Sequence, residues 1–192
     1  MIDHGPAARR LAALLPAIPD SALTGPTPCA DLDVATLLDH VHGLAIAFRQ
    51  AAAKDLDGPS QPPEFGASSL DPEWRTRIPE LLDDLVAAWQ APDAWTGMTE
   101  AGGVQLPGDV AGSVALNELI VHGWDLARAT GRPYTAGEDE VEACLEFVRP
   151  AVEETGGKGV DGLFGPAVPV PGDAAPLDRL LGLTGRDPSW TP

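Results

Sequence analysis

The sequence predicts an all-α protein, a bundle of helices joined by long loops. One observation is that glycine (21 residues) and proline (20 residues) gather in clusters, and the stretches between the clusters are poor in both. These clusters span 19–28, 58–66, 102–108, 131–137 and 156–173. The other is that apolar residues recur every three to four positions between the clusters, which is the period of an amphipathic helix. Strand alternation is weak, and 167–170 is its one candidate.

The first two helices are expected at 3–15 and 34–54. Pro16 ends the first, because proline lacks the backbone donor that a helix needs, and Pro6 is an alternative start at the first helical position. Asp33 is the expected N-cap of the second, since its carboxylate can accept free amide hydrogens of the first turn. The buried face of this second helix consists of Val34, Leu37, Leu38, Val41, Leu44, Ala45, Phe48 and Ala52.

The third and fourth helices are expected at 72–90 and 109–130. Asp71 is the expected cap of the third, and Pro79 is an alternative start. Gly131 ends the fourth, because glycine readily adopts the left-handed conformation that closes a helix. The fourth helix is apolar on almost every side, which is typical of a helix buried at the centre of a protein.

Two further helices are expected at 138–155 and 177–183. The segment 156–173 between them is rich in glycine, proline and valine, so we expect it to be extended or looped. We therefore predict a four-helix bundle within residues 1–155 and a Gly/Pro-rich C-terminal extension, 156–192, packed on it.

The charge excludes several function classes. A net charge of −17 repels phosphate backbones and anionic membranes, so we expect no nucleic-acid partner and no membrane partner. No apolar run reaches the roughly 18 residues of a membrane span, and the N-terminus lacks the apolar core of a signal peptide. We expect a cytoplasmic protein, in which Cys29 and Cys144 are thiols rather than a disulfide.

The chemistry is expected on the fourth helix. Glu118 and His122 are four residues apart and share a face, and Asp125 follows three residues later on the same face. A buried ionised carboxylate costs several kcal/mol unless it is paired or bound to a cation. A divalent ion held by Glu118 and His122 would remove this cost, although such a pair is also compatible with a surface ion pair or a core hydrogen bond.

A third ligand must come from another helix. His40 lies at the edge of the apolar face of the second helix, whereas His42 is turned by about 200° toward the polar side. His4 is too near the terminus to be favoured. We therefore predict a metal site of His40, Glu118 and His122.

Two other residues near this site have alternative roles. Asp125 is a partner of a ligating histidine or a catalytic base, or it pairs with Arg128. Cys29 would need a helix N-terminus or a nearby cation to become a nucleophile, and we favour a packing role for it.

Several motifs show a resemblance to a known family. They are Thr27-Pro28-Cys29-Ala30-Asp31, Leu37-Leu38-Asp39-His40-Val41, the stretch Glu118–Gly131 with its His-Gly-Trp-Asp-Leu-Ala run, and the tail segments 164–170, 177–181 and 185–188. The chain resembles actinobacterial metal-binding proteins related to mycothiol-dependent maleylpyruvate isomerase, in the DinB-like superfamily of four-helix bundles. The resemblance implies a metal triad at His40, Glu118 and His122, the positions that the helical argument also reaches. Leu32 stands where the family has an aromatic residue, and the chain is too short for the full C-terminal domain of the isomerases.

The resemblance implies a metal-dependent enzyme that uses a low-molecular-weight thiol, a mycothiol-type S-transferase or isomerase. Its partners would be the thiol and an electrophilic small molecule, with Arg128 contacting an anionic substrate; a homodimer is left open. Zinc is the first choice of metal, and nickel, iron or manganese are alternatives. A metal-dependent hydrolase with Asp125 as base, and a non-catalytic metal-binding module, are the competing hypotheses.

Overall fold

The all-α prediction is confirmed by a computed structural model that describes residues 1–30, 32–55 and 65–192. Over these residues there are six α-helices, three short 3-10 helices and one β-hairpin. The α-helices are α1 (Gly5–Leu14), α2 (Val34–Ala53), α3 (Trp74–Trp89), α4 (Gly108–Ala129), α5 (Glu138–Thr155) and α6 (Pro176–Leu183). The 3-10 helices are η1 (Leu15–Ala17), η2 (Asp20–Ala22) and η3 (Pro92–Trp95), and the strands are β1 (Met98–Ala101) and β2 (Val104–Pro107).

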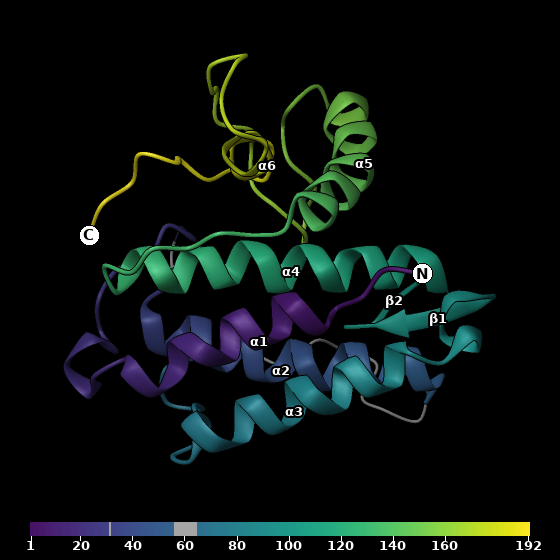
Figure 1. Ribbon diagram of the computed structural model, residues 1–192, viewed down its shortest axis with the longest axis horizontal. Coiled ribbons are helices and arrows are strands. Elements are labelled where there is room, and N and C mark those ends of the chain that lie inside the picture. Colours follow the sequence, from purple (N-terminus) through teal and green to yellow (C-terminus); the bar gives the residue numbers. More distant parts are fainter. Residues whose placement is uncertain (31, 56–64) are drawn as a thin grey trace.

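Helix α4 is the central element of the fold. Helices α1, α2 and α3 lie on one side of it, whereas α5 and α6 lie on the other (Figure 1). Helices α1 to α4 form the bundle, and α5 packs against both α4 and α6. Because it has neighbours on both sides, α4 is buried almost continuously from Ala111 to Ala127, as its apolar sequence predicts. The domain boundary at residue 155 stays a prediction.

Several predicted helix ends are confirmed. The side chain of Asp33 caps α2, with its Oδ1 accepting a hydrogen bond from the Thr36 amide at 2.8 Å. Helix α2 closes at Lys54, which adopts a left-handed conformation at φ 56°. Gly131, at φ 66°, follows α4 and allows the chain to turn toward α5. The Gly58-Pro59 and Pro62-Pro63 pairs, which belong to the predicted Gly/Pro cluster that follows α2, lie outside the described residues.

The N-terminus of α3 differs from its prediction. The helix begins at Trp74 with Glu73 as N-cap residue, so Pro79 lies inside it rather than at its start. Asp71 accepts a hydrogen bond from the Glu73 amide at 2.7 Å and caps the preceding turn instead of the helix. Trp74 and Ile78 are buried in the core, and this packing offsets the backbone hydrogen bond that Pro79 cannot donate.

The hairpin lies in a stretch that the sequence analysis treats as a loop. Its strands are joined by Gly102 and Gly103, both at positive φ, which is the two-residue turn that suits the twist of a hairpin. The hydroxyl of Thr99 in β1 donates to the carbonyl of Ala51 at 2.6 Å and fixes the hairpin to the end of α2. The Gly-Gly pair is a recognisable turn signal, but each strand is only four residues long.

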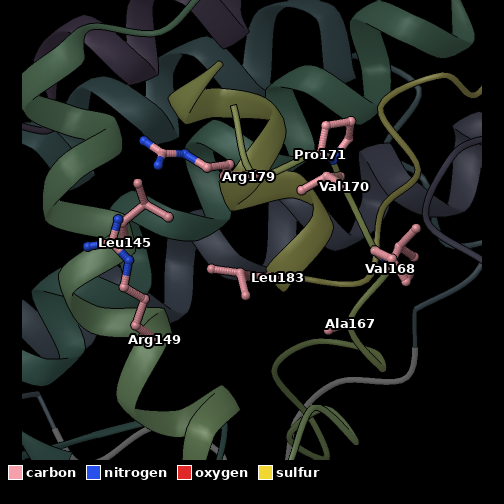
Figure 2. A pocket seen from close by; sticks show the side chains of 10 residues that line it. Leu145, Arg149, Ala167, Val168, Val170, Pro171, Arg179 and Leu183 are labelled. Carbon is pink, nitrogen blue, oxygen red and sulfur yellow. The ribbon is translucent and has the colours of Figure 1, made fainter. Parts of the chain in front are cut away.

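The segment after α5 is irregular, as expected, but its candidate strand at 167–170 is wrong. Val168 donates its amide to the carbonyl of Gly182 in α6, and Ala167 donates to Gly157 in the turn after α5, so these residues pair singly with a helix and a turn rather than with a strand. An open cavity of about 370 Å³ lies between α5, α6 and residues 167–172 (Figure 2).

Over residues 1–30, 32–55 and 65–192, no helix is both long and apolar enough to cross a membrane.

Candidate metal centre

Helices α2 and α4 bring His40, Glu118 and His122 together. The Oε2 atom of Glu118 lies 3.0 Å from Nε2 of His122 on the next turn of α4. The same oxygen lies 3.3 Å from Nε2 of His40 on α2. The two imidazole rings are nearly perpendicular, at 82°, with 4.8 Å between their centroids. One carboxylate oxygen and two ring nitrogens therefore converge on one point between the two helices.

This donor set fits a divalent cation. Zinc binds nitrogen and oxygen at about 2.0–2.2 Å, and a tetrahedral angle then places neighbouring ligand atoms about 3.3 Å apart. The three ligand atoms of His40, Glu118 and His122 all lie within 4.8 Å of one another. Three protein ligands leave one position of a four-coordinate ion open, which is typical of catalytic rather than structural zinc sites. That these residues hold a metal stays a prediction.

Burial and neighbouring charges have opposite effects on the pKa values of Glu118 and His122. Burial by itself would raise the pKa of Glu118, but the charge of His122 and hydrogen bonds from both histidines hold it well below its usual range. Burial would lower the pKa of His122, but the charge of Glu118, together with hydrogen bonds to Asp125 and Glu118, raises it to about 9. A proton on His122 thus compensates the buried carboxylate, and a cation would replace that proton.

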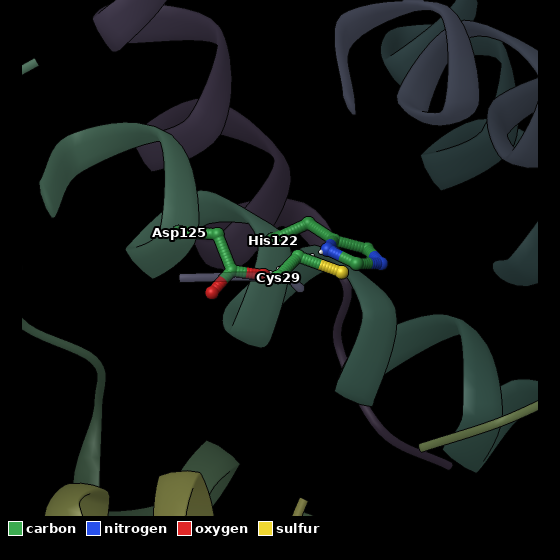
Figure 3. Close-up of side chains that lie close together, drawn as sticks. All are labelled: Cys29, His122 and Asp125. Carbon is green, nitrogen blue, oxygen red and sulfur yellow. Dashed lines mark hydrogen bonds and ion pairs between the residues drawn. The ribbon is translucent and has the colours of Figure 1, made fainter. Parts of the chain in front are cut away.

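Asp125 holds the second nitrogen of His122. Its Oδ2 lies 3.0 Å from Nδ1 of His122, and the side chain is fully buried (Figure 3). With Nδ1 donating to Asp125, Nε2 is the nitrogen that faces Glu118, and once a cation replaces its proton the lone pair of Nε2 has the orientation that a metal ligand needs. Asp125 therefore contacts an imidazole, one of the roles expected from the sequence.

The ionic partner of Asp125 is Arg186, not Arg128. Arg186 follows α6, is buried, and places Nη2 3.1 Å from Oδ2 of Asp125. Its Nη1 donates to the carbonyl of Thr184 at 2.7 Å, which fixes the guanidinium relative to the end of α6. No role for Arg186 is predicted from the sequence, although the residue lies in one of the tail segments that resemble the family.

Arg128 points elsewhere. Its Nη2 donates to the carbonyl of Pro188 at 2.9 Å, and its guanidinium lies 5.6 Å from the ring centroid of Trp124. The contacts of the described residues do not join it to His40, Glu118 or His122. Its role as a substrate contact stays a prediction.

The two other histidines lie outside the cluster. His4 is buried rather than frayed, because its Nε2 meets the carbonyl of Gly112 at 2.9 Å and its ring packs on Trp89 and Trp95. His42 is half-exposed on α2, as its position on the helix predicts.

The segment that follows residue 64 covers His40. The ring of Phe65 meets that of His40 edge-on, with 4.5 Å between centroids. The amide of Gly66 donates to Oδ2 of Asp39 at 3.1 Å, which fixes this segment to α2. Neither contact was expected, because helical periodicity says nothing about where a loop packs.

The sequence matches a family model and two individual proteins. Residues 4–127 match the family model described as Mycothiol maleylpyruvate isomerase N-terminal domain. Two uncharacterized proteins of Mycobacterium tuberculosis, from strains CDC 1551 / Oshkosh and ATCC 25618 / H37Rv, are each 29% identical over 199 aligned residues, covering 97% of this chain and 97% of theirs.

Solved structures share the fold. The crystal structure of the mycothiol-dependent maleylpyruvate isomerase superposes with a TM-score of 0.60 over 78% of this chain and 66% of that chain, at 18% identity. A histidine-to-alanine mutant of the same enzyme gives 0.59 with the same coverage and identity. The chain therefore spans just under two thirds of the length of that isomerase.

Proposed function

The chain belongs to the mycothiol maleylpyruvate isomerase N-terminal domain family, and on this premise we propose that it is a metal-dependent enzyme of low-molecular-weight thiol chemistry. The thiol would be of the mycothiol type, and the reaction an S-transfer or an isomerisation. The observation that supports this most is the contact of one buried carboxylate oxygen of Glu118 with imidazole nitrogens from two different helices.

The charges around the cluster favour an anionic ligand. Glu118 contributes one negative charge, and the charges of Asp125 and Arg186 cancel. With both histidines neutral, a divalent cation would leave the centre with one net positive charge. When bound, such an ion would stabilise the thiolate form of a thiol at neutral pH. Zinc suits two imidazoles and one carboxylate, and nickel, iron(II) and manganese remain alternatives.

The buried partners of His122 support an orienting role for Asp125. Its Oδ2 accepts from both His122 and Arg186, and its Oδ1 lies 3.5 Å from Nε of Arg186. A carboxylate engaged in this way holds an imidazole in place but is poorly available to accept a proton from water. This favours thiol chemistry over a hydrolase that uses Asp125 as its base.

The substrate is proposed only as a class. A thiolate adds to electron-poor carbon, and the family name points to conjugated acids as acceptors. If the thiol leaves again after rotation about the attacked bond, the outcome is cis–trans isomerisation; if it stays, the outcome is transfer. This chain need not accept the substrate of the isomerase itself, because it spans only 66% of that structure. A homodimer and a cytoplasmic location stay predictions.

The test is an assay of the full chain, purified without a polyhistidine tag and loaded with zinc. Mycothiol is supplied with a panel of conjugated acids, epoxides and alkyl halides, and thiol consumption and isomerisation are followed. We expect turnover above that of free thiol, dependent on metal and lost in His122→Ala, whereas His42→Ala retains it. Turnover without any thiol would favour hydrolysis. Rates equal to free thiol across the panel would contradict the proposal.

A further inference from the structure

The cavity between α5 and α6 has one wall that the fold holds in place. The Val168 amide donates to the carbonyl of Gly182 in α6 at 2.8 Å, and the Ala167 amide donates to the carbonyl of Gly157 at 2.9 Å. A Cβ at Gly182 would lie 2.8 Å from the Val168 carbonyl oxygen and 2.8 Å from Cγ1 of Val170, so a glycine lets this segment approach α6 closely. The shape of the cavity is therefore determined by the fold and not by a free loop.

Most side chains that line the cavity are apolar. Leu145 comes from α5, Leu183 from α6, and Val168 and Val170 from the C-terminal extension. Leu183 and the two valines are only half-buried, so the protein itself leaves part of their apolar surface uncovered. The volume of about 370 Å³ is at the lower end of the range for small-molecule sites. The cavity therefore suits a small ligand with an apolar body.

The backbone of the extension offers this cavity few hydrogen-bond donors. The amides of Ala167 and Val168 are used within the protein, and Pro169 and Pro171 have no amide hydrogen. Polar groups of a ligand must therefore be bound by side chains. Among the described residues that line the cavity, the polar side chains are two arginines.

These arginines are Arg149 of α5 and Arg179 of α6. Both extend toward the side of the cavity where Leu145 lies, away from the valines of the extension (Figure 2). Nη1 of Arg149 lies 3.3 Å from Oε1 of Glu142 in an exposed ion pair. Arg179 has no carboxylate partner within the part of the chain that the structure describes, and its buried Nε has no acceptor there. One side of the cavity is thus cationic and the other apolar.

The charges at the cavity favour a monoanion. An unpaired arginine is unexpected in a chain with 29 acidic and 12 basic residues, whose overall charge repels anions. The charges of Arg149 and Glu142 cancel, so Arg179 leaves one net positive charge. A carboxylate matches this charge and can accept two parallel hydrogen bonds from a guanidinium. A phosphate dianion would leave one charge uncompensated beside apolar side chains.

We propose that this cavity binds a small organic acid, with its carboxylate at Arg179 and Arg149 and its apolar chain against Val168, Val170 and Leu183. The described residues that line it include none of the three predicted metal ligands, so the site is distinct from the metal centre. The inference goes beyond the proposed function and does not depend on it.

The experiment titrates the full chain, metal-free, with acetate, butyrate, hexanoate and the neutral hexanamide, followed by calorimetry. Without a metal ion, a carboxylate cannot bind by coordination. We expect one saturable site for hexanoate, with affinity rising by about two- to fourfold for each methylene added after butyrate. Hexanamide should bind at least about tenfold more weakly, because it lacks the charge. Equal affinities for hexanoate and hexanamide, or no saturation by hexanoate, would overturn the proposal.

The cationic side is tested with paired variants. Arg179→Gln should weaken hexanoate binding by at least about tenfold, and Arg179→Lys should retain part of the affinity. Glu142→Gln should strengthen binding by about two- to threefold, because Arg149 loses its competing partner. An unchanged affinity in Arg179→Gln, with a circular dichroism spectrum like that of the wild type, would refute the assignment.

The apolar side and the location are tested separately. Val170→Thr replaces a methyl group with a hydroxyl and should weaken hexanoate binding without affecting acetate. Arg77→Gln removes an exposed arginine from α3 and should leave all affinities unchanged. His122→Ala should also retain hexanoate binding. Loss of binding in His122→Ala would place the carboxylate at the metal centre and overturn the proposal.

Discussion

Arg186 and Asp125 form an ion pair inside the protein, with 3.1 Å between Nη2 and Oδ2 and no more than 8% of either side chain exposed. The two residues are 61 positions apart, so the pair fixes the end of the C-terminal extension to the face of α4 that carries His122. The orientation of His122 therefore depends on a residue from outside the bundle.

Replacing Arg186 should destabilise the fold more than any surface charge change. Arg186→Met leaves Asp125 buried without its cation, and we expect the free energy of unfolding to fall by about 3–5 kcal/mol. The double variant Arg186→Met/Asp125→Asn should recover part of this, because the unpaired charge is gone. Urea denaturation followed by circular dichroism measures both.

The matched control is Arg149→Met, which removes an exposed pair with Glu142. Such pairs contribute about 0–1 kcal/mol, so its unfolding midpoint should hardly move. Equal losses in Arg186→Met and Arg149→Met would show that the buried pair does not stabilise the fold.

Metal content should depend on the three clustered residues and on the carboxylate that holds His122, but not on His42. We expect about one divalent ion per chain in untagged protein, and its loss in His122→Ala and Glu118→Ala, because each removes one of three ligands. Asp125→Asn should weaken binding by about 10- to 100-fold, since the imidazole is no longer held by a carboxylate. Elemental analysis after dialysis measures the stoichiometry. His42→Ala is the control, and a loss of metal in this variant would count against the assignment of His40.

The convergence of His40 with Glu118 and His122 could be predicted from the sequence because it depends on regular helices. Residues four apart share a helix face, and the apolar arc of α2 shows which of its histidines faces inward. The structure brings these three side chains together. The burial of α4 was predictable for the same reason, since its apolar residues cover almost every side.

The contacts made by loops could not be predicted from the sequence. Arg186 reaches Asp125 only because the extension folds back over α4, and no local pattern specifies that path. Phe65 packs on His40 from a segment without periodicity. Thr27 and Cys29 were recognised as part of a motif, but Arg186, whose Nη2 lies 3.4 Å from Sγ of Cys29, comes from the far end of the chain.

The stability of the metal-free protein should decrease as pH rises above neutrality. The pKa of His122 is raised to about 9 in the folded state, against about 6.5 in the unfolded chain. A raised pKa stabilises the fold fully below pH 6.5, and the contribution is lost as pH rises toward 9. We expect a loss on the order of 3 kcal/mol over this window, measured by urea denaturation in the presence of a chelator. His122→Gln should flatten the profile; an unchanged slope in that variant would exclude His122 as its source.

Metal affinity should change in the opposite direction over the same range. Binding must displace the proton that His122 shares with Glu118, so the affinity should increase by about tenfold per pH unit up to about pH 9 and then level off. Competition with a chelator of known pH dependence measures it. A flat profile between pH 7 and 9 would mean that the ion does not bind through His122.

Packing on the opposite end of α4 should affect stability without affecting metal. A Cβ at Gly112 would lie 2.5 Å and 2.8 Å from two ring carbons of Trp95 and 3.1 Å from Trp89. The indole of Trp95 cannot easily move away, because its Nε1 donates to the Trp89 carbonyl at 2.8 Å and its ring packs on His4. Gly112→Ala should therefore lower the free energy of unfolding by about 1–3 kcal/mol, despite the better helix propensity of alanine. Ser113→Ala, the next residue on α4, should change it by no more than about 0.5 kcal/mol, and both variants should retain full metal stoichiometry. Wild-type stability in Gly112→Ala would show that the Trp95 ring is free to rotate and does not fix η3 to α4.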